Sequence, residues 1–155
     1  VVPVGGAQPV NACFQQRLPN GGLSAPQQNI RDGQLPASPQ WRVVLNPRYE
    51  REVGRYMVFA DMLVSHQSEQ FFAIEQDPLL EQPAFTTVDL TIGLTPQDNG
   101  FSASLFAKNL FDTRFFTNMA HNGLLTTATI TPNNLTAFLP KNAFRYFGFT
   151  VGYSF

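Results

Sequence analysis

The residues with the most chemical potential in this sequence are two histidines and one cysteine, at His66, His121 and Cys13. A metal site needs several such ligands, or carboxylates, at a short and regular spacing, and neither histidine has a neighbour at such a spacing. Cys13 has no second cysteine with which to form an intrachain disulfide or a cysteine-based zinc site. We therefore interpret both histidines as surface residues and expect no metal site and no cofactor.

Ser65, His66 and Asp61 together supply the residue types of a serine hydrolase triad. Ser65 and His66 are adjacent, however, and adjacent residues on a strand point to opposite faces of a sheet. They cannot then form the hydrogen-bonded relay that the triad requires. We expect no catalytic residue and a protein that is not an enzyme.

Composition narrows the class of protein. Only 14% of the 155 residues are charged, against about 25% in globular proteins, which argues against an ordinary water-facing surface. The net charge of −1 argues against nucleic acid as a partner, and the 13% of aromatic residues argues against disorder. No segment approaches the roughly 20 apolar residues of a membrane-spanning helix. A membrane β-barrel stays open, because its strands are about 9–11 residues long and half polar.

Apolar and polar residues alternate with a period of two in the larger part of the chain, after forty residues rich in Gly, Pro, Gln and Asn. The alternating segments are 41–50, 56–64, 87–94, 101–111 and 146–155. This period predicts strands with one apolar and one polar face. We expect an all-β protein of about five antiparallel, up-and-down strands and no helix.

The predicted connections alternate between short and long. Short turns at 51–55 and 96–100 contrast with long segments at 1–40, 73–84 and 113–143. Outer-membrane barrels have short periplasmic turns and longer extracellular loops. We therefore expect the two turns to be periplasmic and the three long segments to be extracellular.

A soluble β-sandwich binding module would also alternate, so the pattern alone leaves two alternatives. Large aromatics such as Trp41, Phe101 and Phe155 stand at the ends of the apolar faces, as in the aromatic girdles of membrane barrels. The polar faces are rich in Ser, Thr, Gly and Asn and carry few charges, which suits a wet lumen. These features favour the transmembrane β-barrel.

Four segments resemble the C-terminal end of a TonB-dependent outer-membrane receptor. Residues 108–112, KNLFD, resemble the family's "NLFD" signature, and residues 144–155 resemble its closing strand. Residues 35–41 are similar to the "lp.aPkw" segment that leads into an earlier strand, and residues 85–94 to the "y.lvdl.igl" strand. The resemblance covers roughly residues 33–155, with the four segments in the family's order.

The resemblance implies that residues 1–155 are a C-terminal fragment of a 22-stranded barrel with a plugged lumen. Residues 1–40 would form a long extracellular loop, and residues 41–155 about five barrel strands. Asp61, Asp89 and Lys108, on the polar face, would then touch the plug or water, a direct role in a substrate path being the less favoured alternative. Cys13 lies where related receptors often carry a cysteine pair, but the second cysteine is missing.

The function implied by the resemblance is TonB-coupled uptake of a scarce nutrient, such as an iron–siderophore complex, across the outer membrane of a Gram-negative bacterium. Implied partners are outer-membrane lipid, the rest of the barrel and its plug, TonB through an upstream segment, and a small-molecule ligand. A passive porin or structural outer-membrane barrel is the alternative. No substrate-binding residue can be assigned. Residues 115–140 lack charge and are rich in Thr and Asn, so they could bind a neutral ligand, although a plain surface loop is favoured.

The last alternating segment also resembles the C-terminal signal that barrel-assembly machinery recognises in outer-membrane proteins. Its apolar residues are Phe147, Phe149, Val151, Tyr153 and Phe155. The assembly signal is assigned to Phe155 with Tyr153, Val151 and Phe149. The alternative is that Phe155 is one more girdle aromatic.

Overall fold

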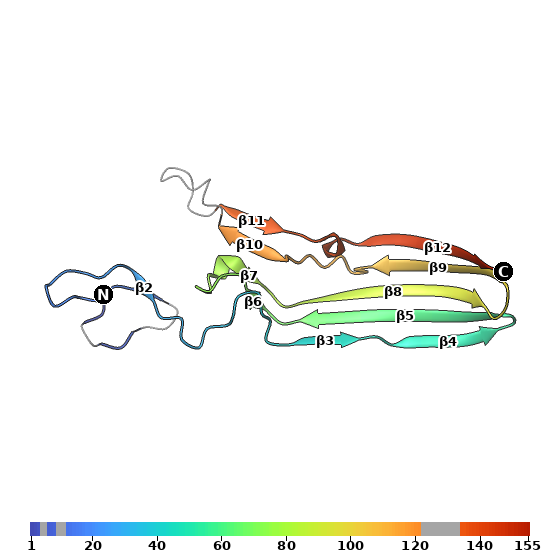
Figure 1. Ribbon diagram of the computed structural model, residues 1–155, viewed down its shortest axis with the longest axis horizontal. Helices are drawn as coiled ribbons and strands as arrows, with labels where there is room; N and C mark the ends of the chain where they lie inside the picture. The colour runs from blue at the N-terminus through green and yellow to red at the C-terminus, as the bar shows by residue number, and fades with distance from the viewer. Residues whose placement is uncertain (4–5, 9–11, 122–133) are drawn as a thin grey trace.

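The computed structural model describes residues 1–3, 6–8, 12–121 and 134–155 and shows an antiparallel all-β protein. One large sheet has the strand order β12-β9-β8-β5-β3, and β4 also pairs with β5 (Figure 1). Its strands are β3 (Arg42–Leu45), β4 (Arg48–Val53), β5 (Tyr56–Gln67), β8 (Phe85–Pro96), β9 (Gly100–Lys108) and β12 (Tyr146–Ser154). The prediction of an all-β protein with antiparallel strands is thereby confirmed, and the large sheet has six strands where about five were expected.

The first predicted strand, 41–50, is divided into β3 and β4 at Pro47. Leu45 pairs with Val64 and Arg48 pairs with Asp61, so the register of β5 continues unbroken across the division. Proline has no N–H to give to the ladder, which is why it is confined to edge strands or bulges. β3 and β4 therefore act as one edge strand.

The long connections contain more regular structure than the sequence predicts. Three two-stranded sheets lie in them, formed by β1 (Cys13–Phe14) with β2 (Gln27–Gln28), β6 (Gln70–Phe71) with β7 (Glu81–Gln82), and β10 (Asn118–His121) with β11 (Leu135–Phe138). Two single-turn 3₁₀ helices, η1 (Pro78–Leu80) and η2 (Lys141–Ala143), correct the expectation of no helix. Neither 3₁₀ turn shows a hydrophobic period, because three residues are too few to carry one. Among the described residues, no helix has the length and apolar character needed to cross a membrane.

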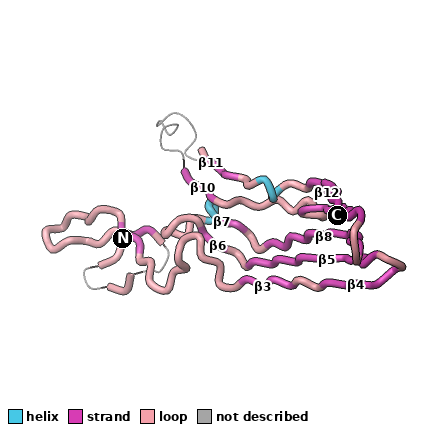
Figure 2. Tube along the Cα trace, turned by 45° about the vertical axis from the view of Figure 1, so that its right-hand side comes forward, coloured by secondary structure: helices cyan, strands magenta, loops and turns pink. Residues whose placement is uncertain are grey.

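The short and long connections lie at opposite ends of the large sheet (Figures 1 and 2). Gly54, in the turn between β4 and β5, has a φ of 62°, and Gly100, at the start of β9, has a φ of 155°. Both values are accessible to glycine without steric cost. The end of β12 lies beside these turns, whereas the small sheets and the N-terminal segment lie at the other end. We call these the turn end and the loop end.

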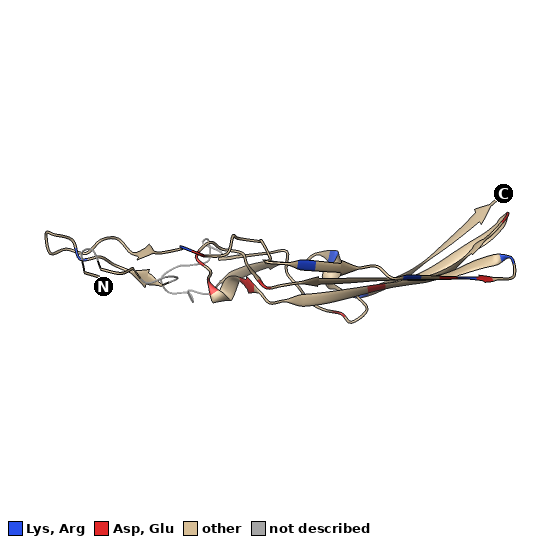
Figure 3. Ribbon diagram, turned by 90° about the horizontal axis from the view of Figure 1, so that it is seen from below, with Lys and Arg blue, Asp and Glu red and all other residues tan. Residues whose placement is uncertain are grey.

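The large sheet is a single curved layer (Figure 3). Among the described residues, no second layer covers it, and the buried hydrophobic side chains are Phe14, Leu80, Val88, Ala107, Phe115 and Ala143. Strand β12 and the β3/β4 strand are the two edges, and no closed barrel is found. The sheet therefore leaves both apolar surface and backbone polar groups without a partner within the described part of the chain.

Two glycines on the polar face lie beneath aromatic rings of the neighbouring strand. Gly148 pairs with Phe106, and a Cβ added to Gly148 would lie 2.2 Å from that ring. Gly93 has the same relation to Phe59, at 2.7 Å. Covering a glycine with a cross-strand ring is a known way to pin the register of a sheet.

Gly148→Ala is expected to destabilise the protein by about 1–2 kcal/mol, because the Phe106 ring must leave its position over the glycine. The matched control is Gly152→Ala on the same face of β12, where the added Cβ meets only the Ser102 hydroxyl, at 2.8 Å. Urea unfolding of both variants gives the comparison. Equal losses in the two variants would contradict a special role for the ring.

Candidate functional site

The most extensive surface feature is the exposed apolar face of the large sheet. Its large exposed members are Val43, Leu45, Tyr49, Val53, Val58, Met62, Ile92, Leu94, Phe101, Leu105, Phe147, Phe149, Val151 and Tyr153. The register places Phe149 beside Leu105, and Leu105 beside Ile92, so the face is continuous across strands. Phe149 is 75% exposed. Soluble monomers rarely expose such a contiguous apolar patch.

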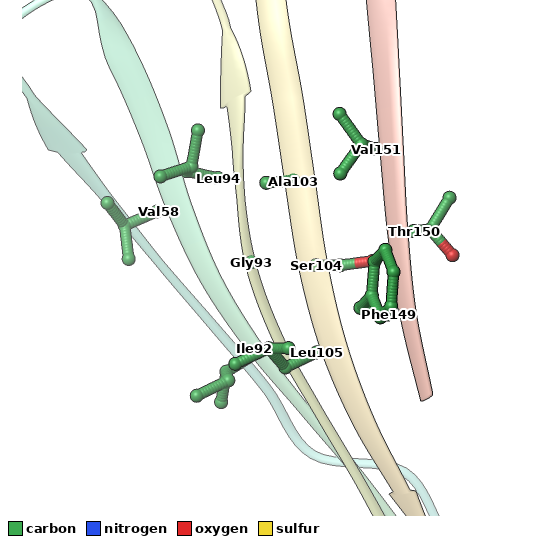
Figure 4. A pocket seen from close by; sticks show the side chains of 10 residues that line it. All are labelled: Val58, Ile92, Gly93, Leu94, Ala103, Ser104, Leu105, Phe149, Thr150 and Val151. Atoms are coloured by element: carbon green, nitrogen blue, oxygen red, sulfur yellow. The ribbon is translucent and has the colours of Figure 1, made fainter. Parts of the chain in front are cut away.

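A shallow groove crosses this face (Figure 4). It has a volume of about 500 Å³ and is formed where the small residue Ala103 lies between the larger Leu94 and Val151. Ile92 and Leu105 line its other part. The groove is almost wholly apolar in its lining, so it offers a surface for acyl chains or for another apolar side chain.

Aromatic rings occupy both ends of the apolar face, as the sequence predicts. At the turn end, the Tyr153 ring lies 4.8 Å from Phe101 and 6.1 Å from Phe155. At the loop end, Trp41 stacks on His66 with 4.7 Å between ring centroids. Rings at both ends of an apolar band are typical of the two interfaces of a membrane barrel.

The stripe assigned to barrel assembly lies on this face. Phe147, Phe149, Val151 and Tyr153 are all exposed, and Phe155, just beyond the end of β12, is 95% exposed. The structure thus places Phe149, Val151, Tyr153 and Phe155 together on one edge strand.

On the opposite, polar face, the three charged residues singled out from the sequence form cross-strand ion pairs. Asp61 lies 3.1 Å from Arg48, and Asp89 lies 2.9 Å from Lys108. Each pair is partly exposed, and such pairs contribute at most about 1 kcal/mol. Asp61, Asp89 and Lys108 therefore form ion pairs between neighbouring strands of the sheet.

The KNLFD segment ends β9 in a network centred on Asn109, which is 1% exposed and has a φ of 49°. Its side-chain amide donates to the carbonyl of Thr113 at 2.9 Å and to that of Asn142 at 3.1 Å, and its Oδ1 accepts from the N–H of Thr113 at 2.9 Å. Its own N–H donates to Asp89 Oδ1 at 2.9 Å. Asn109 therefore ties β8, β9 and the segment before β12 together.

Asp112 extends this network towards β12. Its carboxylate accepts from the N–H of Arg145 at 2.8 Å and pairs with Arg114 at 2.8 Å. The hydrogen bond from Arg145, followed by the positive charge of Arg114, holds the pKa of Asp112 below its usual range. The guanidinium of Arg114 also lies 4.1 Å from the centroid of Phe144. The signature segment thus has a structural role that its resemblance alone did not predict.

The two histidines have different surroundings. His66 bonds Thr86 at 2.7 Å on the apolar face, and Ser65, its neighbour, belongs to the polar face, as the argument against a hydrolase relay requires. His121 is exposed, as expected of a surface residue, and its Nε2 lies 2.7 Å from Asp77 Oδ2, a contact that its sequence neighbours do not indicate. That hydrogen bond is the main cause of a lowered pKa for Asp77, which also caps η1. No group of three or more potential metal ligands occurs among the described residues.

One expectation from the sequence concerns a loop that is only partly described. The uncharged loop 115–140 is described at 115–121 and 134–140, and its residues 122–133 lie outside the described part of the chain. In the described part, Phe115 packs on Phe85 with 4.4 Å between ring centroids. Cys13, in β1, is exposed and forms no disulfide in the structure.

A scan of protein-family models, a search of curated proteins and a search of solved structures each found no match to this chain.

Proposed function

We propose that this chain is part of the wall of a TonB-dependent receptor in the outer membrane of a Gram-negative bacterium. Its apolar face lies against lipid and its polar face lines the lumen. The receptor carries out energy-coupled uptake of a scarce nutrient, such as an iron–siderophore complex. The observation that supports this most is the continuous, exposed apolar face of a sheet whose opposite face is polar.

Strand length supports a membrane-spanning wall. Strands β9 and β12 have nine residues each, and β5 and β8 have twelve. A tilted strand needs about 9–11 residues to cross the hydrocarbon core. A sandwich of this sheet would need a second sheet to cover the apolar face, and the described residues provide none.

Strand direction supports completion of the barrel by further strands. Each neighbour in the order β12-β9-β8-β5-β3 is antiparallel, so the two edge strands run in the same direction. They cannot pair with each other, or with a second copy in the same orientation, in an antiparallel ladder. Unpaired strand edges are not tolerated in hydrocarbon. The proposal therefore includes additional strands from the rest of the receptor.

The coupling to TonB is supported by the resemblance of residues 108–112 and 144–155 to the receptor family. The wall of a passive porin also has one apolar and one polar face, but a porin lacks a plug and TonB coupling. An upstream plug domain of about 100–150 residues in the full-length gene separates the two.

Cys13 is a native reporter of topology, because it is exposed in the segment expected to be extracellular. A membrane-impermeant maleimide is expected to label Cys13 in intact cells. In the double variant Cys13→Ser, Asn99→Cys the new thiol lies in the turn between β8 and β9, so it should react only after the outer membrane is permeabilised. Mass spectrometry of the purified protein measures both.

The single variant Cys13→Ser is the control for labelling of other proteins. The reverse orientation would give the opposite result in intact cells: labelling of the double variant Cys13→Ser, Asn99→Cys and no labelling of Cys13 in the wild-type protein. A water-soluble monomer labelled equally at both positions would contradict the membrane proposal and favour the β-sandwich.

A further inference from the structure

A polar pocket of about 310 Å³ lies at the loop end of the large sheet. Strands β3, β5 and β8 form one wall through Arg42, Ser65, Gln67 and Thr87. These four residues belong to the polar face by the pairing of Arg42 with Gln67 and of Ser65 with Thr87. The pocket is therefore on the face opposite to the apolar groove.

Several hydrogen-bonding groups of the pocket have no protein partner. Ser65, Thr87 and Gln70 make no side-chain hydrogen bond among the described residues, although Gln70 is only 6% exposed. Among the described residues, no buried side-chain N or O atom lacks a partner, so these unpaired groups are accessible from the pocket and available to a bound ligand.

The charge of the pocket is positive. Arg42 lines it and hydrogen-bonds the side-chain oxygen of Gln67, which is neutral. No carboxylate forms an ion pair with Arg42 among the described residues, and the lining contains neither Asp nor Glu. A guanidinium presents a planar fork of N–H donors that matches a carboxylate.

An aromatic wall completes the pocket. Phe85 and Phe115 stack almost parallel, with an interplanar angle of 7°, and Phe115 is buried. Phe116 also lines the pocket, and its N–H is held by the side chain of Gln82 at 2.7 Å. The rings offer a flat apolar surface beside the donors.

We propose that this pocket binds a small organic carboxylate with a flat apolar body. Arg42 contacts the carboxylate, Ser65 and Thr87 donate their hydroxyl hydrogens, and the phenylalanine rings cover the apolar part. The inference rests on the proposed function in placing the pocket at the outer mouth of the lumen, where it would contribute to ligand capture. Binding itself can be measured without transport.

Benzoate and benzamide form a matched pair of probes, because they share the ring and differ in charge. Saturation-transfer NMR on the full-length protein in detergent measures both affinities. Benzoate is expected to bind and to bind more tightly than benzamide. Arg42→Gln should weaken benzoate binding by about tenfold or more, as expected for loss of a charge-assisted contact, and leave benzamide binding unchanged.

Arg51→Gln is the matched control, since Arg51 lies on β4 outside the pocket. It should leave both affinities unchanged, and Thr87→Val should weaken benzoate binding even where Arg42→Gln misfolds. Absence of benzoate binding, equal affinity for the two probes, or an equal loss in Arg51→Gln would overturn the inference. Surface labelling of Cys13 is independent of these outcomes, so the proposed function can stand where the ligand class fails.

Discussion

Replacing Asn109 with alanine is expected to destabilise the protein by about 2–5 kcal/mol. The substitution leaves three backbone groups without their partner: the N–H and carbonyl of Thr113 and the carbonyl of Asn142. These groups are near a side chain that is almost fully buried, so water replaces the lost bonds poorly. Alanine also tolerates the left-handed backbone at this position less well than asparagine.

A second variant separates the two causes. Asn109→Gly removes the same hydrogen bonds but accepts a φ of 49° without strain. It should therefore recover up to about 1–2 kcal/mol relative to alanine and stay well below the wild-type stability. Asn99→Ala, in the turn between β8 and β9, is a control for the effect of losing an asparagine. Urea unfolding in lipid vesicles measures all three.

Wild-type stability in Asn109→Ala would show that the hydrogen-bond network of Asn109 does not stabilise the fold. A loss confined to Asn109→Ala, with Asn109→Gly unchanged, would assign the whole effect to backbone strain. Only a loss shared by both variants supports the hydrogen-bond account.

The five strands could be predicted from the sequence because their alternation is local. In β12 the apolar residues recur at every second position from Phe147 to Tyr153, and each lies on the same face in the structure. The two tight turns could also be predicted, because each contains a glycine. In the structure Gly54 and Gly100 adopt positive φ values. The break at Pro47 follows from its missing N–H and could have been predicted from the same residue.

The loop-end contacts could not be predicted, because they join residues far apart in the chain. Asn109 reaches Asn142 across 33 residues, and His121 reaches Asp77 across 44. Neither pair has a spacing that marks it. The sequence pattern places Asn109 inside the predicted strand 101–111, whereas β9 ends at Lys108. The local signal was the residue type alone, because asparagine tolerates the left-handed conformation.

The polar pocket shows the same limit. Arg42 and Phe115 line it from segments more than seventy residues apart, brought together by the pairing of β3 with β5 and of β5 with β8. The sequence shows which face Arg42 occupies. It does not show that the guanidinium meets Gln67 instead of a carboxylate.

On the proposed function, deleting Phe155 from the full-length protein is expected to reduce its outer-membrane level in cells to a small fraction of the wild-type level. The proposed assembly signal comprises Phe155, Tyr153, Val151 and Phe149, which form an exposed stripe on an edge strand. An exposed edge with unpaired backbone groups is available to a partner that adds a strand. Immunoblots of outer-membrane fractions give the level.

The same deletion should change refolding into detergent only mildly. Phe155 contacts Tyr153 at 6.1 Å and is otherwise exposed, so its loss removes about 1–3 kcal/mol of burial at most. Phe147→Ala is the matched control, because it removes an exposed ring from the same stripe and leaves the proposed signal intact. It should lower the level in cells far less than the deletion does.

The two explanations of Phe155 differ in whether its deletion lowers the amount of folded protein in detergent as well as in cells. A girdle ring stabilises the folded barrel by contact with the interface, so its removal acts equally in cells and in detergent. A recognition signal acts before the barrel is folded, so its removal lowers the level of folded protein only in cells. Normal levels of the deletion variant in cells would rule out the signal and leave the lipid-facing stripe as the role of these residues.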